Sequence, residues 1–300
     1  MNKNSLLALF LTSFIWTGGI EAASLIDDLG IEVEMAAPPE RIVSLAPSNT
    51  ELLFALGLGK KVVGVTEVCN FPEQVDQVEK VAGFNVLNLE KIVAVRPDLV
   101  LASRGNDIEG IRSLREFGIN VFSLDIQSLD QLLEAVDRIG NLCAKENAAT
   151  RLRSELKERI AAVELRLTAV KSRPRVMWGY WNDPVYTAGP GTMIGDLISR
   201  AGGVNVGDVA SGTWPQVGLE TILVWAPEII ITTYNPVGVD SLAVEVARLR
   251  RTDGWQRVPA VIEGRLYFIE PDWLLRPGPR LVDAYEQLAR LIHPSLFPMP

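Results

Sequence analysis

Short apolar runs without alternation recur in the first half of the chain and predict buried strands. They lie at residues 42–45, 62–65, 99–102 and 121–124, separated by stretches that favour helices. Strands covered by helices on both faces are apolar throughout, whereas half-exposed strands alternate apolar and polar residues. The pattern therefore predicts a small parallel sheet wrapped by helices.

Two segments far apart in the chain have similar sequences. Residues 88–103, NLEKIVAVRPDLVLAS, are echoed at residues 218–233, GLETILVWAPEIIITT. In both, a short helical pattern is followed by a proline and an apolar strand. Pro97 and Pro227 end the helices, and Arg96 is pushed toward extended geometry because it precedes a proline. A repeated helix–strand unit predicts two similar lobes, and a cleft between lobes is a common ligand site.

Residues 145–171 contain no glycine or proline and consist mostly of strong helix formers. Their apolar residues recur at helical spacing, which predicts one helix roughly 40 Å long. Strands are predicted again after it, at 175–180, 229–232 and 266–269. The predicted fold class is α/β, with two Rossmann-like lobes joined by one long α-helix and a ligand cleft between them.

The N-terminus has the features of a secretory signal peptide over residues 1–23. Lys3 supplies a positive charge, an apolar stretch follows, and Ala22-Ala23 suit cleavage. An uncleaved signal anchor is the alternative, whereas a lipid anchor is not expected because no cysteine lies nearby. Residues 24–40 are expected to be a lead-in before the first strand. The remaining parts are an N-terminal α/β lobe at 24–144, a spine helix at 145–171 and a C-terminal α/β lobe at 172–300.

Composition excludes some classes of function. The chain has 300 residues, 48% hydrophobic and 22% charged, with a net charge of −8 and no basic cluster, which argues against nucleic-acid binding. The single histidine, His293, leaves too few parts for a histidine-based metal site or a catalytic triad. Cys69 and Cys143 could form a disulfide in an exported protein, but nothing in the sequence shows that they meet. Two unpaired thiols are the simpler expectation.

A glycine-rich stretch, GPGTMIG at residues 189–195, precedes a predicted helix. A dinucleotide site needs G-x-G-x-x-G directly after a strand, with an acid about 20 residues later. Here the third glycine is one place late, Pro190 stiffens the loop, and Asp208 fits the acid only loosely. A turn and helix cap is therefore favoured over a nucleotide site.

Several aromatic residues fall in predicted loops or strand ends rather than on a helical stripe. They are Trp178, Tyr180, Trp181, Trp214 and Trp273. Such residues can fill local cores, or they can form flat walls for a large planar ligand. Arg276, close to Trp273, can bind a carboxylate, amide or phosphate group. Glu90 and Glu220 lie in first turns of predicted helices, where a carboxylate is stabilised by the helix dipole.

Four segments together resemble the periplasmic cobalamin-binding proteins of ABC importers, part of a group that also binds ferric siderophores and haem. The segments are RIVSLAPSNTELLFALGLGKKVVGVT, NLEKIVAVRPDLVLAS, TWPQVGLETILVWAPEIIITT and PDWLLRPGPRLVDAYEQLARLIHP. The resemblance covers most of the chain after about Arg41. It implies two α/β lobes joined by one long helix, with the ligand between them. It also implies that Glu90 and Glu220 dock onto arginines of the membrane permease.

The resemblance further implies a set of corrin-contacting residues. These are Val68, Phe84, Ser103, Trp181 or its neighbour Tyr180, Trp214, Asp272, Trp273 and Arg276. Val68 and Ser103 stand where the best-known cobalamin binder has aromatic residues, and Phe84 replaces a tryptophan, so the N-terminal wall is less aromatic.

The resulting expectation is a monomeric periplasmic protein, with no cofactor of its own, that delivers cobalamin or a related corrinoid to an ABC permease. A ferric-siderophore or haem binder is the alternative, and a secreted enzyme on the same scaffold is a third reading.

Overall fold

The computed structural model describes residues 23–180, 184–233 and 240–297. Its first half, called the N-lobe here, has a parallel sheet in the order β5-β4-β3-β6-β7. The strands are β3 Ile42–Ser44, β4 Val62–Thr66, β5 Lys80–Ala82, β6 Leu99–Ser103 and β7 Asn120–Leu124. The helices are α1 Pro47–Ala55, α2 Leu89–Ala94, α3 Ile108–Glu116 and α4 Leu129–Leu142, with short 3-10 turns at Gly59–Lys61 and Glu73–Gln77.

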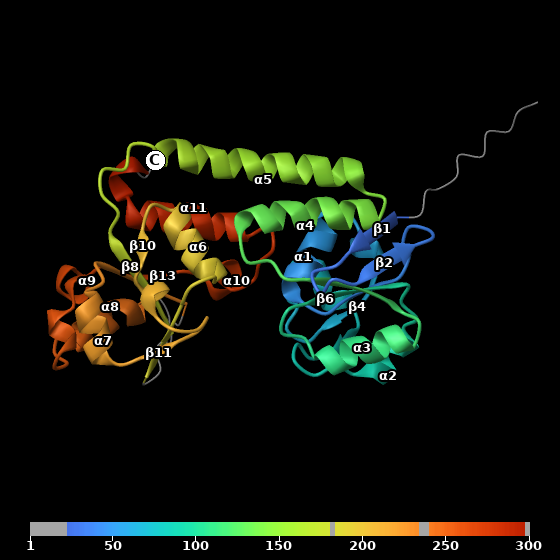
Figure 1. The fold of residues 1–300 in the computed structure, drawn as a ribbon, viewed down its shortest axis with the longest axis horizontal. Coiled ribbons are helices and arrows are strands. Elements are labelled where there is room, and N and C mark those ends of the chain that lie inside the picture. Colours follow the sequence, from blue (N-terminus) through green and yellow to red (C-terminus); the bar gives the residue numbers. More distant parts are fainter. Residues whose placement is uncertain (1–22, 181–183, 234–239, 298–300) are drawn as a thin grey trace, which may run out of the picture.

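The second half, called the C-lobe, has a mixed sheet in the order β11-β9-β8-β12-β13, with β10 paired to β8. Its strands are β8 Arg175–Tyr180, β9 Val185–Thr187, β10 Val204–Asn205, β11 Gln216–Val217, β12 Ile229–Thr232 and β13 Leu266–Phe268. Its helices are α6 Met193–Arg200, α7 Leu219–Trp225, α8 Asp240–Leu249, α9 Pro259–Glu263, α10 Pro271–Leu274 and α11 Leu281–Ile292. Short 3-10 turns lie at Val206–Val209, Trp255–Arg257 and Pro294–Leu296. The predicted fold class, two α/β lobes joined by a long helix, is confirmed (Figure 1).

The repeated segments form the same unit in both lobes, α2 with β6 and α7 with β12. The backbone N–H of Arg41 donates to the Asp98 carboxylate at 3.0 Å, and that of Arg175 donates to Glu228 at 2.9 Å. Each arginine also donates from its guanidinium to a carbonyl at the end of the repeated helix. The internal repeat therefore also includes an earlier strand in each lobe. Arg41 directly precedes β3, and Arg175 begins β8.

The extended geometry expected for Arg96 is wrong. Arg96 has a φ of 46°, and Ala226 in the equivalent position has a φ of 45°. A following proline disfavours the right-handed helical region, and both residues leave it for the left-handed region instead. This turns the chain sharply from helix to strand, and the arginines described above satisfy the exposed carbonyls.

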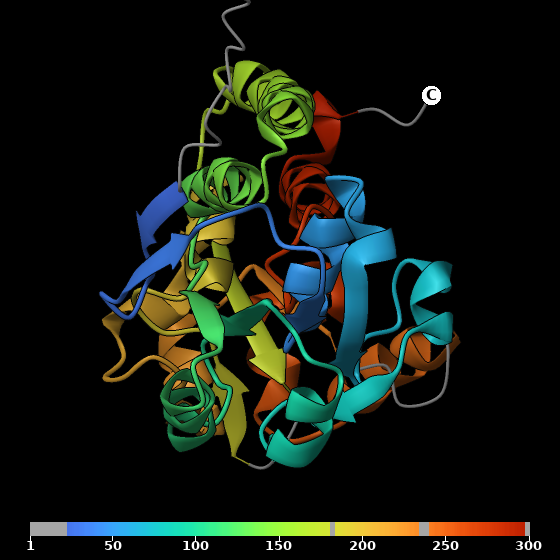
Figure 2. The same ribbon diagram turned by 90° about the vertical axis from the view of Figure 1, so that its right-hand side faces the viewer.

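The joining helix, α5, extends over Glu146–Leu167. It is about 33 Å long at 1.5 Å per residue. It is shorter than predicted because the chain leaves the helix at Thr168, whose hydroxyl donates to the Leu165 carbonyl. α5 runs alongside both α4 and α11 (Figures 1 and 2).

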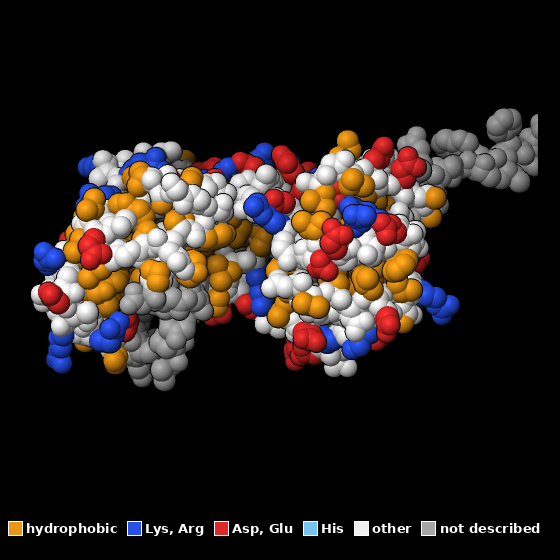
Figure 3. Space-filling model, turned by 60° about the horizontal axis from the view of Figure 1, so that its bottom comes forward, with side chains coloured by type: hydrophobic (Ala, Val, Ile, Leu, Met, Phe, Trp, Pro, Cys, Tyr) orange, Lys and Arg blue, Asp and Glu red, His pale blue; other side chains and the backbone are white. Residues whose placement is uncertain are grey.

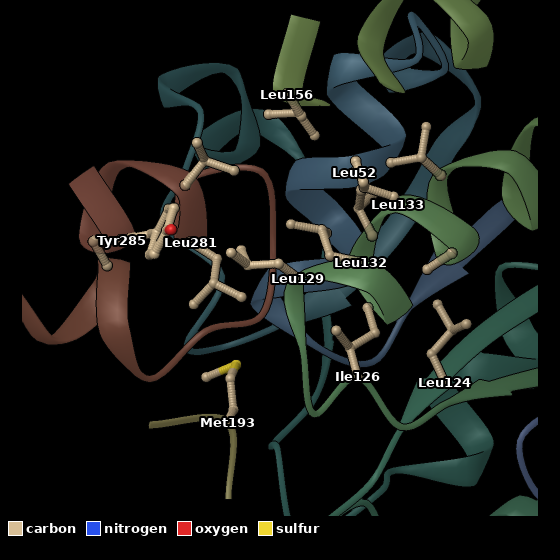
Figure 4. Packing of buried hydrophobic residues seen from close by; sticks show 14 of the residues in the cluster. Leu52, Leu124, Ile126, Leu129, Leu132, Leu133, Leu156, Met193, Leu281 and Tyr285 are labelled. Atoms are coloured by element: carbon tan, nitrogen blue, oxygen red, sulfur yellow. The ribbon is translucent and has the colours of Figure 1, made fainter. Parts of the chain in front are cut away.

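One apolar core passes through both lobes. A single cluster of buried residues includes side chains from α1, α4 and α5 as well as from α6 and α11. Figure 4 shows this packing, with labelled residues that include Leu52, Leu132, Leu156, Met193, Leu281 and Tyr285. Separate smaller clusters cover the other faces of the two sheets. The lobes are therefore fixed to each other by shared side-chain packing, and the domain limits at 144 and 172 stay a prediction.

Residues 24–40 were expected to precede the first strand, but two strands already lie within them. β1 Ala23–Ile26 and β2 Glu32–Met35 form an antiparallel hairpin against the N-lobe. Val33 and Met35 are buried, and Asp27 forms a 2.6 Å ion pair with Arg115 of α3. The alternation of Glu32 to Met35 carried the signal for a half-buried strand.

Cys69 and Cys143 are both buried and unpaired, as the simpler expectation had it. Burial raises the pKa of the Cys143 thiol to about 12, so this group stays protonated at neutral pH. Among the described residues, no helix is both long and apolar enough to cross a membrane.

A buried ion pair also joins the lobes. Arg280 at the start of α11 donates two hydrogen bonds to Glu51 of α1, at 3.0 and 2.6 Å. The Glu51 side chain is only 2% exposed, and the guanidinium of Arg280 lies 4.0 Å from the ring centre of Phe71. Burial raises the pKa of Glu51, although Arg280 lowers it in part. The charge of Glu51 is thus tolerated because Arg280 faces it.

We predict that Arg280→Met destabilises the protein by about 3 kcal/mol at neutral pH, because Glu51 loses its partner in a desolvated site. Losing Arg280 raises the pKa of Glu51 further. The loss of unfolding free energy is therefore largest at a pH where the carboxylate is ionised. It shrinks as the pH falls toward 4.5, the ordinary pKa of a glutamate side chain. Urea unfolding at several pH values measures it.

The matched control is Arg112→Ala, which removes an exposed ion pair on α3. This change is expected to cost less than about 1 kcal/mol. If both variants lost the same unfolding free energy at every pH, the Glu51–Arg280 pair would not be the stabilising buried pair described here.

Candidate functional site

A cavity of about 480 Å³ lies between the two lobes. The N-lobe contributes segments that follow the carboxyl ends of β3, β6 and β7, namely residues 46–48, 103–105 and 125–127. Ligands of open α/β sheets bind at this edge. The C-lobe contributes the start of α6, Thr213 with Trp214, and residues 275–277. Figure 3 looks toward the side away from α5 and shows hydrophobic side chains along the C-lobe side of the cleft.

Asn106 ties the cavity-lining segments of the N-lobe together. Its amide group donates to the carbonyls of Leu45 and Phe84, at 2.9 and 2.8 Å, and its oxygen accepts from the N–H of Ser103 at 2.7 Å. Asn106 is itself buried. A buried amide that satisfies three backbone groups fixes the ends of two strands and the Phe84 loop relative to one another. Sequence reasoning missed this residue.

Trp214 forms the aromatic part of the C-lobe wall. It is 48% exposed and meets the buried Trp178 edge to face, with ring centres 5.7 Å apart. The Thr187 hydroxyl donates to the Trp178 carbonyl at 2.6 Å, which holds that strand end in place. One indole therefore supports the other, and the exposed ring is free to face a ligand.

The glycine-rich stretch is a turn and helix cap, as favoured from the sequence. The Thr192 hydroxyl accepts from the Gly195 N–H at 3.1 Å and caps α6. A Cβ at Gly189 would lie 2.2 Å from the carbonyl oxygen of Gly212, so only glycine lets the Trp214 loop pack this closely. The stretch positions the C-lobe wall.

Five of the residues expected to contact ligand line the cavity. They are Val68, Phe84, Ser103, Trp214 and Arg276. Asp272 and Trp273 lie on α10 next to the cavity: Asp272 pairs with Arg276 at 2.9 Å, and Trp273 packs partly buried against the shared core. Tyr180 ends β8, and Trp181 lies outside the described residues. The contact of all these residues with a ligand stays a prediction.

Three polar residues on the N-lobe wall were not foreseen: Arg104, Asp125 and Gln127. Asp125 accepts from Arg104 at 3.1 Å and from the Gln127 amide at 2.5 Å. They follow β6 and β7 directly, and polar residues just after buried parallel strands are a sequence signal for this edge of the sheet.

Arg276 is held by residues of both lobes. It donates to the side-chain oxygen of Asn70 at 2.5 Å, and Asn70 donates to Asp272 at 3.1 Å. Together with the Arg276–Asp272 pair, these bonds close a ring across the cleft. The cavity therefore has one arginine on each wall, and each arginine sits beside an aspartate.

Glu90 and Glu220 are exposed in the first turns of α2 and α7, one on each lobe. Both helices lie on the side of the molecule away from α5 (Figure 1). Their position suits contact with a second macromolecule on that side, and this role stays a prediction.

Within the described part of the chain, no three His, Cys, Asp or Glu residues gather as a metal site would require. The cavity is lined by apolar residues together with the paired charges described above.

Comparisons with known proteins agree with this geometry. The model of a family described as periplasmic binding protein matches residues 42–273. The chain is 35% identical over 273 residues to an uncharacterised ABC transporter substrate-binding lipoprotein, YvrC of Bacillus subtilis (strain 168), covering 89% of this chain and 84% of the relative.

Two solved structures share the fold. One is the periplasmic vitamin B12-binding protein BtuF of Vibrio cholerae, with a TM-score of 0.76, 28% identity, and coverage of 87% of this chain and 99% of that one. The other is the periplasmic haem-binding protein RhuT of Roseiflexus sp. RS-1, with a TM-score of 0.75, 25% identity, and coverage of 86% and 99%. With its model matched over most of the sequence, the protein belongs to the periplasmic binding protein family.

Proposed function

We propose that this solute-binding protein captures cobalamin or a related corrinoid and delivers it to the permease of an ABC transporter. The observation that carries the proposal is the interlobe cavity, which combines aromatic side chains on opposite walls, Phe84 and Trp214, with charges paired beside it. A large planar ring fits such walls, since aromatic faces stack on extended ring systems. The vitamin B12-binding relative supports the same ligand.

The charges favour a corrinoid over the alternatives, haem and ferric siderophores. Arg104 is paired with Asp125, and Arg276 with Asp272, so two positive and two negative groups balance at the cavity. Haem carries two carboxylates, and many ferric siderophores are anionic, so they gain little from a site without net positive charge. A corrinoid presents mostly neutral amides. Haem remains the second candidate because RhuT is similarly close in fold.

In this proposal Phe84 and Trp214 pack on the ring, and Arg276 with Asp272 addresses polar groups at its edge. Val68, Ser103, Trp273 and Tyr180 or Trp181 complete the set of ligand contacts. The corrinoid is cargo rather than a cofactor, and the protein is not an enzyme.

We further propose export by a signal peptide over residues 1–23 and a monomeric protein in the periplasm. The Bacillus subtilis relative is a lipoprotein.

Purified mature protein is expected to bind cyanocobalamin one to one, measured by calorimetry and by co-elution of red colour. Trp214→Ala should weaken binding about 10- to 100-fold, because it removes a stacking face worth about 1.5 to 3 kcal/mol. Phe117→Ala, an exposed aromatic on the far end of α3, is the control and should leave the affinity unchanged. No binding at high micromolar cyanocobalamin would discard cobalamin, and haemin and ferric siderophores would be titrated next.

The double variant Glu90→Ala with Glu220→Ala is expected to keep its ligand affinity and to lose transport, because the two carboxylates face the permease rather than the cavity. Uptake of radiolabelled ligand in cells lacking the native gene measures this. Glu155→Ala with Glu158→Ala, both exposed on α5, removes the same charge on the other side of the molecule and should transport normally. Normal uptake by the first variant would refute the docking role.

A further inference from the structure

The N-lobe wall of the cavity carries a polar group of three residues, Arg104, Asp125 and Gln127, called the N-lobe trio here. Asp125 accepts from both of the others. All three residues line the cavity, although the Arg104 side chain is 62% exposed. The residues assigned above to polar ligand contacts, Asp272 and Arg276, belong to the C-lobe, so the N-lobe trio has no role in that assignment.

Residues that do not line the cavity hold Asp125 of the trio in position. The backbone N–H of Asp125 donates to the carboxylate of Asp28, in the turn between β1 and β2, at 2.6 Å. Arg138 of α4 forms an ion pair with the Asp28 carboxylate at 2.5 Å. An ordinary exposed ion pair lacks such support. A site whose groups are already oriented loses less entropy when a ligand binds.

We propose that the N-lobe trio is a subsite for a neutral carboxamide of the ligand, an inference that rests on the proposed function. A carboxamide both donates and accepts hydrogen bonds. Arg104 has five N–H donors, of which Asp125 takes one, so donors remain for the amide oxygen. The oxygens of Asp125 and Gln127 can accept from the amide nitrogen.

A carboxylate fits the same place poorly. Asp125 already neutralises Arg104, and a second negative group beside it would be repelled. The trio therefore discriminates an amide from the acid that differs from it by one functional group. Sites that match hydrogen-bond donors and acceptors discriminate such pairs more strongly than apolar pockets do.

The C-lobe repeats this chemistry on the opposite wall. Arg276 and Asp272 of the C-lobe, joined by Asn70 from the N-lobe, again combine a guanidinium, a carboxylate and an amide side chain. A ligand that fits both walls has a flat body and neutral amides at opposite edges. This is a narrower description than a planar ring alone, and it explains why an N-lobe wall with few aromatic residues can still bind selectively.

The test compares cyanocobalamin with its monocarboxylic acid derivatives, in each of which one side-chain amide is hydrolysed. For the wild type, at least one derivative should bind about 10-fold more weakly than the parent. Asp125→Asn should bring that derivative to within about 3-fold of the parent, because the repelling charge is gone while Arg104 stays. Arg104→Ala should weaken binding of the parent amide.

Arg112→Ala, an exposed arginine on α3, is the control and should leave all ratios unchanged. The ratio of acid to amide affinity is informative because a general structural loss would weaken both ligands equally. If the wild type binds cyanocobalamin but the ratio is the same in Asp125→Asn, the subsite is refuted and the proposed function stands.

The other outcomes separate the two proposals. If the wild type binds haemin but no corrinoid, cobalamin is refuted as the ligand. The subsite is then tested by the ratio of the affinities for haemin and for its bis-amide, measured in the wild type and in Asp125→Asn. A preference for free haemin that Asp125→Asn does not alter would overturn the subsite. Binding of neither class refutes both proposals.

Discussion

The apolar core shared by the two lobes is the constraint on which the rest of the structure depends. α4 of the N-lobe and α11 of the C-lobe lie against the same helix, α5, and their side chains belong to one buried cluster. Arg159 of α5 fastens this arrangement by pairing with Asp283 and Glu286 of α11. Separating the lobes would expose apolar surface at a cost of about 25 cal/mol per Å². The shared core therefore opposes separation of the two lobes that carry the cavity walls.

Polar interactions add to the apolar core and shape the cleft between the lobes. Glu51 and Arg280 form a buried pair that joins the lobes, and Asn70 reaches from the N-lobe to Asp272 and Arg276. These groups could not be paired from the sequence, because Glu51 and Arg280 are 229 positions apart. A comparable separation, 202 and 206 positions, explains why the sequence could single out Asp272 and Arg276 but could not identify Asn70 as their partner.

Much of the architecture was predictable because it rests on local patterns. The repeat around Pro97 and Pro227 revealed two similar units, and the absence of glycine and proline at 145–171 revealed the joining helix. The resemblance to solute-binding proteins then placed Phe84 and Trp214, which do line the cavity.

Features that depend on contacts between distant segments were missed. Asp125 and Gln127 are single polar residues after an apolar run, and their grouping with Arg104 follows from the alignment of β6 with β7. The hairpin at 23–35 was overlooked because each of its strands has only four residues, too few for a clear alternating pattern. The left-handed Arg96 shows a further limit: the following proline disfavours one conformation, and the hydrogen bond from Arg41 to the Arg96 carbonyl helps select among those that remain.

The shared core also affects how far the chain can fold while it is being synthesised. A ribosome makes the N-lobe sheet and α4 long before α11, yet α11 supplies Leu281, Tyr285 and Leu288 to the cluster that α4 also enters. Until α11 has emerged, the inner face of the earlier segments lacks part of its cover. The growing chain is thus kept from completing its fold until almost the last of its helices is present, which leaves a long interval in which the polypeptide is still pliable.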